Sequence, residues 1–149
     1  MGEPTKRQIG KCGELLVQYT LLKKGVDSAH LTTDPGIDLI AFPSVREKPV
    51  TIQVKTSRLH SDYAGDKYLR WQIPETCPAD YIAMVDFHRD KCWLIETEKF
   101  KRKAHHTRDN QRRLHLYLSA REPESLKRQE EEFTEYEMGN AIPKVFGLE

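Results

Sequence analysis

The stretches GIDLIAF at residues 36–42 and VTIQVK at residues 50–55 decide the fold that we expect for this chain. Both alternate apolar and polar residues, which is typical of strands with one buried face. The short segment between them has the length of an ordinary hairpin loop. The pattern therefore predicts two adjacent antiparallel strands.

The register of this hairpin follows from the alternation, with Leu39 set opposite Ile52. The apolar face is then formed by the pairs Ile37–Val54, Leu39–Ile52 and Ala41–Val50. On the other face Asp38 lies opposite Gln53, and Lys55 follows on the same strand. A shift by one residue would set polar groups against apolar ones, so the pattern favours this register. Since directly opposed Cβ atoms lie about 4.5–5.5 Å apart, a carboxylate, an amide oxygen and an ammonium converge on a patch that suits a hard cation.

This arrangement resembles the PD-(D/E)XK nuclease superfamily, in which an Asp is followed on the next strand by an acid or amide, one spacer and a Lys. The residues QVK at 53–55 give the Q-x-K form of that motif. Upstream, GKCGE at 10–14 is similar to the glycine-and-glutamate first helix of many members, including archaeal Holliday junction resolvases and some homing endonucleases. The order of Glu14, Asp38 and the 53–55 motif also agrees, although the resemblance becomes diffuse after Lys55.

The resemblance implies an α/β fold with a central mixed sheet flanked by helices, and a Mg²⁺-dependent DNA endonuclease in which Mn²⁺ can substitute. It implies that Asp38 and the amide oxygen of Gln53 hold the metal, together with the carbonyl of Val54. Lys55 would orient or deprotonate the attacking water, or stabilise charge on the phosphate. Glu14 would be a second carboxylate, but only if the narrow apolar stripe of its helix packs toward the hairpin.

Each role has a plainer alternative. Asp38 could be a turn or cap residue, Gln53 a cross-strand hydrogen-bonding partner and Lys55 an ordinary edge-strand lysine. Glu14 could be a solvated helix residue. Gln18, one turn after Glu14, is a candidate supporting residue or DNA contact. Asp34, in the turn before the first strand of the hairpin, is a rival for the role of Asp38.

Composition limits the class of protein. The 149 residues, 38% hydrophobic and 32% charged, predict a single domain spanning 1–149. No apolar run approaches the roughly 18 residues of a membrane span, and the polar start is unlike a signal peptide, so we expect a cytoplasmic protein. The three cysteines have no metal-binding spacing and are interpreted as reduced thiols. The final Leu148-Glu149 is compatible with the junction of an expression tag.

Charge is distributed unevenly along a chain whose net charge is only +1. Residues 99–121 hold eight Lys or Arg and one acid, whereas residues 122–149 hold three Lys or Arg and eight acids. Local basic density, rather than total charge, decides phosphate binding. The candidate DNA contacts are Arg58, Lys67, Arg70, Lys101, Arg102, Lys103, Arg108, Arg112 and Arg113. The alternative is that these side chains lie on solvated helix faces.

The remaining elements follow from periodicity and from helix and turn signals. The expected helices are about 6–24, capped by Gly25, and 97–104, 108–120 and 123–139. The further strands expected are about 28–33, 69–73, 81–87 and 91–95, with residues 56–67 forming a polar loop. The nuclease core would thus cover about 5–96, and basic and acidic helices would follow over about 97–139.

We therefore predict a site-specific or structure-specific DNA endonuclease, such as a resolvase-like, homing or restriction enzyme. Cutting both strands requires two active sites, so a homodimer or higher homo-oligomer is expected. A catalytically inactive nucleic-acid-binding member of the same fold is one alternative, because Gln53 stands where most members have an acid. A protein-interaction module with an acidic C-terminal helix is another.

Overall fold

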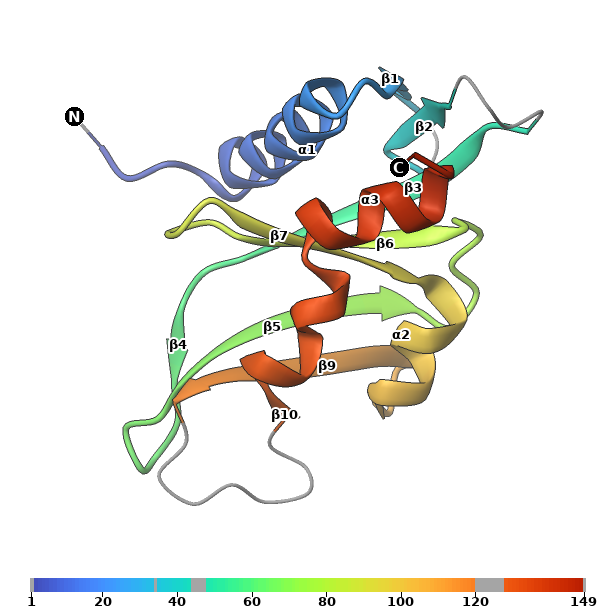
Figure 1. Ribbon diagram of the computed structural model, residues 1–149. Helices are drawn as coiled ribbons and strands as arrows, with labels where there is room; N and C mark the ends of the chain where they lie inside the picture. The colour runs from blue at the N-terminus through green and yellow to red at the C-terminus, as the bar shows by residue number, and fades with distance from the viewer. Residues whose placement is uncertain (1, 34, 44–47, 120–127, 149) are drawn as a thin grey trace.

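The computed structural model describes residues 2–33, 35–43, 48–119 and 128–148, and it arranges them in three layers (Figure 1). The middle layer is a mixed sheet of order β1-β2-β3-β6-β7, in which β3 and β6 are parallel and the other neighbours antiparallel. Its strands are β1 (Asp27–His30), β2 (Leu39–Phe42), β3 (Val50–Ser57), β6 (Tyr81–Asp86) and β7 (Lys91–Glu96). The predicted single-domain α/β fold is confirmed.

Helix α1 (Lys6–Lys23) covers one face of this sheet. It begins with a capping box, in which the Thr5 hydroxyl accepts a hydrogen bond from the Gln8 amide at 3.2 Å and the Gln8 side chain accepts one from the Thr5 amide at 2.8 Å. Gly25, with φ +83°, ends it as expected. The narrow stripe with Val17 and Leu21 is the buried one, both side chains being fully inaccessible.

A second sheet, of order β10-β9-β5-β4 with β8 also paired to β9, packs on the opposite face of the first. Its strands are β4 (His60–Ser61), β5 (Lys67–Pro74), β8 (His105–His106), β9 (Gln111–Ser119) and β10 (Arg128–Gln129). The sequence analysis did not anticipate this sheet. The helix predicted at 108–120 is wrong, because Leu114, Leu116 and Leu118 recur every second residue and all pack inward, which only a strand permits.

Other expected elements differ in extent. Helix α2 (Thr97–Lys103) and the β6–β7 hairpin agree with the predictions. The loop expected at 56–67 instead contains the end of β3 and strand β4. The predicted helix at 123–139 begins outside the described residues, and in its described part a 3-10 helix η1 (Glu130–Tyr136) is followed by α3 (Met138–Phe146). Gly139 therefore lies inside a helix rather than ending one.

Two apolar clusters fill the spaces between the layers. One lies between the helices and the first sheet, where Phe146 of α3 and Leu21 of α1 are fully buried. The other lies between the two sheets, where Trp71 of β5 and Trp93 of β7 pack edge to face with ring centroids 5.6 Å apart. The Trp71 indole also donates a hydrogen bond to the Val85 carbonyl at 3.1 Å, which ties the sheets together.

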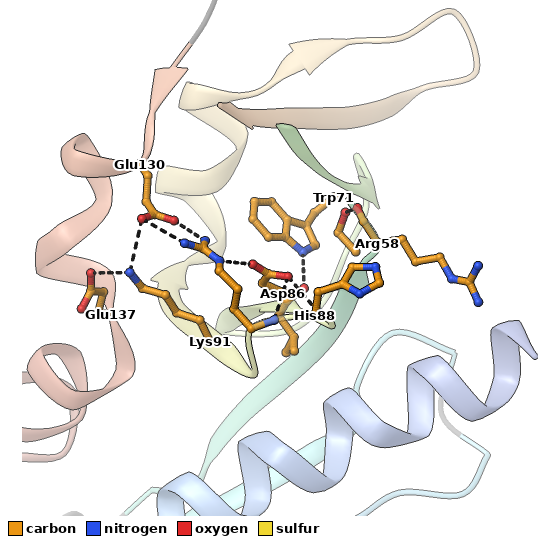
Figure 2. A network of polar contacts seen from close by, with 10 residues as sticks. Arg58, Trp71, Asp86, His88, Lys91, Glu130 and Glu137 are labelled. Atoms are coloured by element: carbon orange, nitrogen blue, oxygen red, sulfur yellow. Dashed lines mark hydrogen bonds and ion pairs between the residues drawn. The ribbon is translucent and has the colours of Figure 1, made fainter. Parts of the chain in front are cut away.

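A network of ion pairs joins the β6–β7 turn to η1 and α3 (Figure 2). Arg89 pairs with both the buried Asp86 carboxylate and Glu130. Lys91 lies 3.4 Å from Glu130 and 3.1 Å from Glu137. The hydrogen bond that Arg89 donates to Glu130 is the main cause that raises the pKa of Arg89. Carboxylates of the acidic C-terminal segment are thus used within the fold. No helix in the described part of the chain is long and apolar enough to cross a membrane.

Candidate active site

The predicted hairpin register is confirmed where β2 and β3 pair, with Leu39 opposite Ile52 and Ala41 opposite Val50. Strand β2, however, begins one residue after Asp38. Ile37 packs in the cluster between the sheets rather than facing Val54, so that part of the predicted pairing is wrong.

The physical reason is a turn of the chain just before β2. Gly36 packs so closely on Pro78 that a Cβ there would lie 2.4 Å from Cδ of the proline ring. The chain therefore leaves β3 at Asp38, and the two strands separate there. We call this point the β2–β3 fork.

Asp38 lies at the β2–β3 fork and is held by its backbone and its carboxylate. Its amide donates a hydrogen bond to the Ile52 carbonyl at 2.9 Å, and its carbonyl accepts one from the Leu31 amide at 3.0 Å. Its Oδ2 accepts a hydrogen bond from the Val54 amide at 2.7 Å. The side chain thus takes the place that a strand carbonyl would occupy, which fixes a half-buried carboxylate beside the backbone of Val54.

Gln53 and Lys55 flank Val54 on the face of β3 that is turned toward the second sheet. The side chain of Gln53 is nearly buried, at 5% exposure, and its Oε1 accepts a hydrogen bond from the Cys77 thiol at 2.9 Å. Burial raises the pKa of Cys77, so the thiol keeps the proton that it donates. Positive charge on Lys55 and Lys101 and negative charge on Asp38 also act on this thiol. Gln53 is thus in contact with Cys77, and the charges of Lys55, Lys101 and Asp38 lie near enough to affect this thiol.

The charges at this point are not paired with each other. Within the described residues, neither Asp38 nor Lys55 forms an ion pair with another side chain. Lys55 is half-buried on a strand that is paired to β6, opposite Met84. A half-buried carboxylate and a half-buried ammonium that form no ion pair within the described residues are expected to interact with a ligand.

Glu14 lies on α1, which covers the face of the first sheet opposite to that of Gln53 and Lys55. Gly13 lies against Thr56 of β3, where a Cβ would come within 1.9 Å of the Thr56 hydroxyl, so only glycine allows the helix this close. The next residue, Glu14, faces β1, with Oε1 3.6 Å from Nδ1 of His30. Since His30 pairs with Leu39, the neighbour of Asp38, Glu14 lies over the same end of the sheet.

Gln18 supports this arrangement from the next turn of α1. Its amide nitrogen donates to the Ser28 carbonyl at 3.1 Å, and its Oε1 lies 2.6 Å from Nε2 of His30. Because that oxygen can only accept, Nε2 of His30 carries a proton. The imidazole is thus held by Gln18, while its Nδ1 faces Glu14 at 3.6 Å without a hydrogen-bond partner in the described part of the chain. The sequence predicted Gln18 as a supporting residue, and the structure places it behind His30.

His30 and Cys77 are contacts of the site that the sequence analysis did not find. His30 is an isolated histidine in a short edge strand, and Cys77 lies in the segment between β5 and β6. Neither stands in a recognisable motif, because both are brought to the site by tertiary packing alone. The rival candidate Asp34 lies outside the described residues.

The available donors favour a hard cation. The carboxylates of Asp38 and Glu14, the amide oxygen of Gln53 and the carbonyl of Val54 are all oxygens, which suits Mg²⁺ or Mn²⁺ rather than zinc. The described part of the chain contains no group of three or more His, Cys, Asp or Glu side chains that could hold a metal. An ion held by Asp38, Gln53 and Val54 would therefore have to keep several water ligands and rely on neutral oxygens.

The candidate DNA contacts occupy several different surfaces. Arg112 pairs with Glu75 and donates to the Lys101 carbonyl at 2.9 Å, so its guanidinium is used within the fold. The Lys103 ammonium lies 5.7 Å from the Phe133 ring centroid. Lys101 lies 3.3 Å from Glu98. The exposed candidates are Arg58, Lys67, Arg70, Arg102 and Arg108.

A hollow adjoins the candidate site on the side where β3 ends. It is lined by Thr56 and Ser57, which follow Lys55, and by basic side chains from three elements. These basic side chains are Lys6, Arg58, His60 and Arg70. The Ser57 hydroxyl accepts a hydrogen bond from the Arg70 amide at 2.9 Å, which fixes β5 against the end of β3. Part of the predicted basic set thus lies around the end of β3, together with Glu3, whose carboxylate lies 4.0 Å from Arg58.

Comparison with solved structures identifies a neighbour of the same architecture. The structure of I-Ssp6803I, a bacterial homing endonuclease, is similar over 97% of this chain and 94% of that chain, with a TM-score of 0.66 and 15% sequence identity. No family model matches the chain. No curated protein matches it in sequence. At this identity the likeness shows the fold, and membership of the PD-(D/E)XK superfamily stays a prediction.

Proposed function

We propose that this chain is a metal-dependent DNA endonuclease with its active site at the β2–β3 fork. The observation that carries the proposal is the position of the Asp38 carboxylate, which is fixed at 2.7 Å from the Val54 amide of β3. Lys55, which forms no ion pair with another described side chain, follows Val54 on β3. The similarity of the fold to a bacterial homing endonuclease supports a nuclease in particular.

The chemistry follows from the donors at the fork. Asp38, Gln53, the Val54 carbonyl and Glu14 would hold Mg²⁺, which when bound would polarise the phosphate and lower the pKa of the attacking water. Lys55, which follows Val54 on β3, would orient that water and stabilise the negative charge that develops on the phosphate. His30 and Gln18 would keep the Glu14 carboxylate directed toward the site.

The direct test is cleavage of plasmid, branched and single-stranded DNA by the purified chain with Mg²⁺, with Mn²⁺ and with excess chelator. We expect cleavage only with metal. Lys55→Ala should abolish cleavage while DNA affinity stays within a few-fold, because the ammonium acts mainly in the transition state. Lys99→Ala, on the exposed face of α2, is the matched control. Absence of cleavage of every substrate with either metal would refute the proposal.

One observation favours a non-catalytic DNA-binding protein instead. The amide oxygen of Gln53 already accepts a hydrogen bond from Cys77, so a metal would have to share it or displace the thiol. Gln53→Glu separates the two cases, because it places a carboxylate in a nearly buried position that only a bound cation can neutralise. In a working site Mg²⁺ should raise the melting temperature of this variant more than that of the unmodified chain.

The interaction-module alternative is weakened, because two acids of the C-terminal segment are paired within the chain, while Glu131, Glu132 and Glu135 are exposed. Glu130 and Glu137 pair with Arg89 and Lys91 of the same chain, so they are not available to a basic partner. Cleavage of both DNA strands by one site per chain requires a second copy. We therefore propose a homodimer or higher homo-oligomer, which sedimentation of the chain with and without duplex DNA would measure.

A further inference from the structure

One face of the second sheet points away from the first sheet, and its composition is unusual. Along β5 and β9 the inward side chains, such as Leu69, Trp71 and Leu116, fill the core. The alternating side chains point outward. We call these outward side chains the outer face; Arg70 is exposed, Tyr68, Gln72, Arg113 and His115 are half-buried, and Tyr117 is only 7% exposed. His60 of β4, opposite Tyr68, and His105 of β8, opposite Arg113, extend it at the edges.

The outer face is cationic and polar. Its positive charge at neutral pH comes from two guanidinium groups, because the lowered pKa values of His60 and His115 keep these imidazoles largely uncharged, and none of its strand residues whose side chains the structure describes is an acid. A sheet face of this kind has no apolar partner to bury. Its charge is complementary to a polyanion, whose phosphates would be neutralised by the arginines.

The side chains of the outer face are ordered by contacts among themselves. Arg113 donates a hydrogen bond from Nε to the Gln72 amide oxygen at 2.8 Å. The Tyr68 ring stacks on His60 at 5.3 Å between centroids and lies 5.0 Å from His115 and 5.2 Å from Tyr117. Side chains that are already held in place lose little conformational freedom on binding, which favours recognition.

The surroundings of His115 show that positive charge accumulates here. The pKa of His115 is lowered to about 4, mainly by burial, with smaller contributions from the positive charges of Arg70, His105, Arg113 and His60. The effect of Arg70 reaches across the strand pair, since it lies opposite His115. The outer face therefore behaves as one electrostatic surface rather than as isolated cations.

This surface is continuous with the candidate active site. Arg70 and His60 belong both to the outer face and to the hollow that follows Lys55 on β3. A DNA strand whose phosphate lies beside Lys55 would therefore pass the hollow and continue over β5 and β9. The eight residues of β5 span about 26 Å at roughly 3.3 Å per residue, which is the rise of about eight base pairs.

We propose that the outer face docks in a groove of duplex DNA beside the phosphate that is cut, and that it determines where the chain binds. A two-stranded antiparallel ribbon such as β5–β9 fits the major groove of B-DNA, which is about 12 Å wide. Arg113 and Gln72 have the side chains that pair with guanine and adenine edges, and Arg70 contacts the backbone. This inference rests on the proposed function for the identity of its ligand.

The test uses the Asp38→Asn chain, which should bind without cutting, and a pool of 40-base-pair duplexes of random sequence. Replacing Arg70 and Arg113 together by Ala should weaken binding about tenfold or more and lower the slope of log K against log salt by about two units. Lys144→Ala is the matched control, because this exposed lysine lies on α3, on the opposite face of the first sheet. It should change affinity less than about twofold.

A second variant guards against misfolding. Gln72→Glu keeps the size of the side chain and its contact with Arg113 but sets a negative charge on the outer face. It should also weaken binding, with unchanged circular dichroism. Sequences selected from the pool should change for Gln72→Ala but not for Lys144→Ala. Unchanged affinity of both the Arg70/Arg113 and the Gln72→Glu variants would overturn the inference.

The outcomes for this inference and for the proposed function are separable. If the unmodified chain cuts DNA and the outer-face variants bind and cut as it does, the inference fails and the nuclease stands. If the chain binds duplexes through the outer face but never cuts with metal, the nuclease fails and the docking surface stands. If the Asp38→Asn chain binds no duplex at any salt concentration, the inference fails whatever the cleavage assay shows.

Discussion

Two clusters of charged side chains lie at different places on the first sheet. One cluster is ion-paired within the described part of the chain, and the other is not. At the β6–β7 turn, Asp86 is only 1% exposed but pairs with Arg89, which in turn pairs with Glu130. At the β2–β3 fork, the half-buried Asp38 and Lys55 form no ion pair with any described side chain.

The difference separates stabilising charges from functional ones. A buried charge is costly unless it is paired and hydrogen-bonded, and the turn meets that requirement within the chain. The fork meets it only in part, with the Val54 amide as the donor to Asp38. Charged side chains that are fixed in position but form no ion pair are expected to bind a ligand of opposite charge. Here we expect Asp38 to bind a cation and Lys55 to bind a phosphate. Substitutions in the two clusters should therefore change different properties.

The largest effect is expected at the fork. Asp38→Asn should lower the cleavage rate by roughly 10³-fold or more, about 4 kcal/mol in the barrier. The free energy of unfolding should change by less than about 1 kcal/mol, because the amide oxygen can still accept from the Val54 amide. Single-turnover cleavage and urea unfolding measure the two quantities. A large loss of stability with a matching loss of activity would show that Asp38 is structural.

The opposite pattern is expected at the β6–β7 turn. Arg89→Met keeps much of the side-chain volume but leaves the Asp86 carboxylate buried with only backbone donors. The cost should be about 2–3 kcal/mol of unfolding free energy, with cleavage per folded molecule unchanged. Arg58 is exposed and has no buried carboxylate partner among the described residues. Arg58→Met should therefore lower the unfolding free energy by less than about 0.5 kcal/mol. Equal stability of both variants would contradict the comparison.

The ion-paired cluster at the β6–β7 turn should also contribute less to folding stability in acid. Burial opposes ionisation of Glu130, but hydrogen bonds and charge from Arg89 and Lys91 hold its pKa below the usual value of 4.5. The folded state thus favours the carboxylate, and this contribution to stability is present above pH 4.5 and is lost as the pH falls through the lowered pKa. Glu130→Gln should remove part of this acid dependence in urea unfolding experiments below pH 4.5.

Some of this organisation was predictable because it is local in sequence. Alternation predicted the register of β2 and β3 where they pair, although not the departure of Ile37, and Gly25 predicted the end of α1. The sequence left open whether the narrow stripe of Val17 and Leu21 or the broad stripe of α1 would face the sheet, so the role of Glu14 stayed conditional. The predicted features depend on neighbours within one or two turns or within one hairpin.

The rest depends on contacts between distant segments. Strand β9 carries many basic residues, which suggested a solvated helix until its pairing with β5 fixed every second side chain inward. The hydrogen bond from Cys77 to Gln53 depends on the turn that packs Gly36 against Pro78. Neither contact is encoded in a local pattern.

The close approach of α1 to β3 gives the next largest effect and links packing to the fork. Gly13→Ala would set a Cβ 1.9 Å from the Thr56 hydroxyl, which must move or push the helix away. We expect a loss of about 1–3 kcal/mol in unfolding free energy and slower cleavage, because Glu14 moves with the helix. Gly10→Ala, in the same helix with nothing within 4 Å, should instead stabilise by about 0.5–1 kcal/mol. Similar results for both glycines would show that α1 does not pack as described.

The smallest expected effect concerns a group that is neither paired nor at the fork. His115 has a pKa of about 4 in the folded chain, first because of burial and then because of Arg70 and its other positive neighbours, against 6.5 ordinarily. Between pH 6.5 and 4 the unfolded chain therefore binds a proton at this position more readily than the folded one, so stability falls as the pH falls. His115→Phe keeps a ring beside Tyr68 and cannot take up that proton. The difference in unfolding free energy between pH 7 and pH 5 should be smaller for this variant, by less than about 1 kcal/mol once solvent screening of a half-exposed group is allowed for. His88→Asn, in the exposed β6–β7 turn, is the control for the loss of a surface histidine. If His115→Phe leaves the pH dependence unchanged, burial and the neighbouring positive charges do not lower the pKa of His115 as the structure indicates.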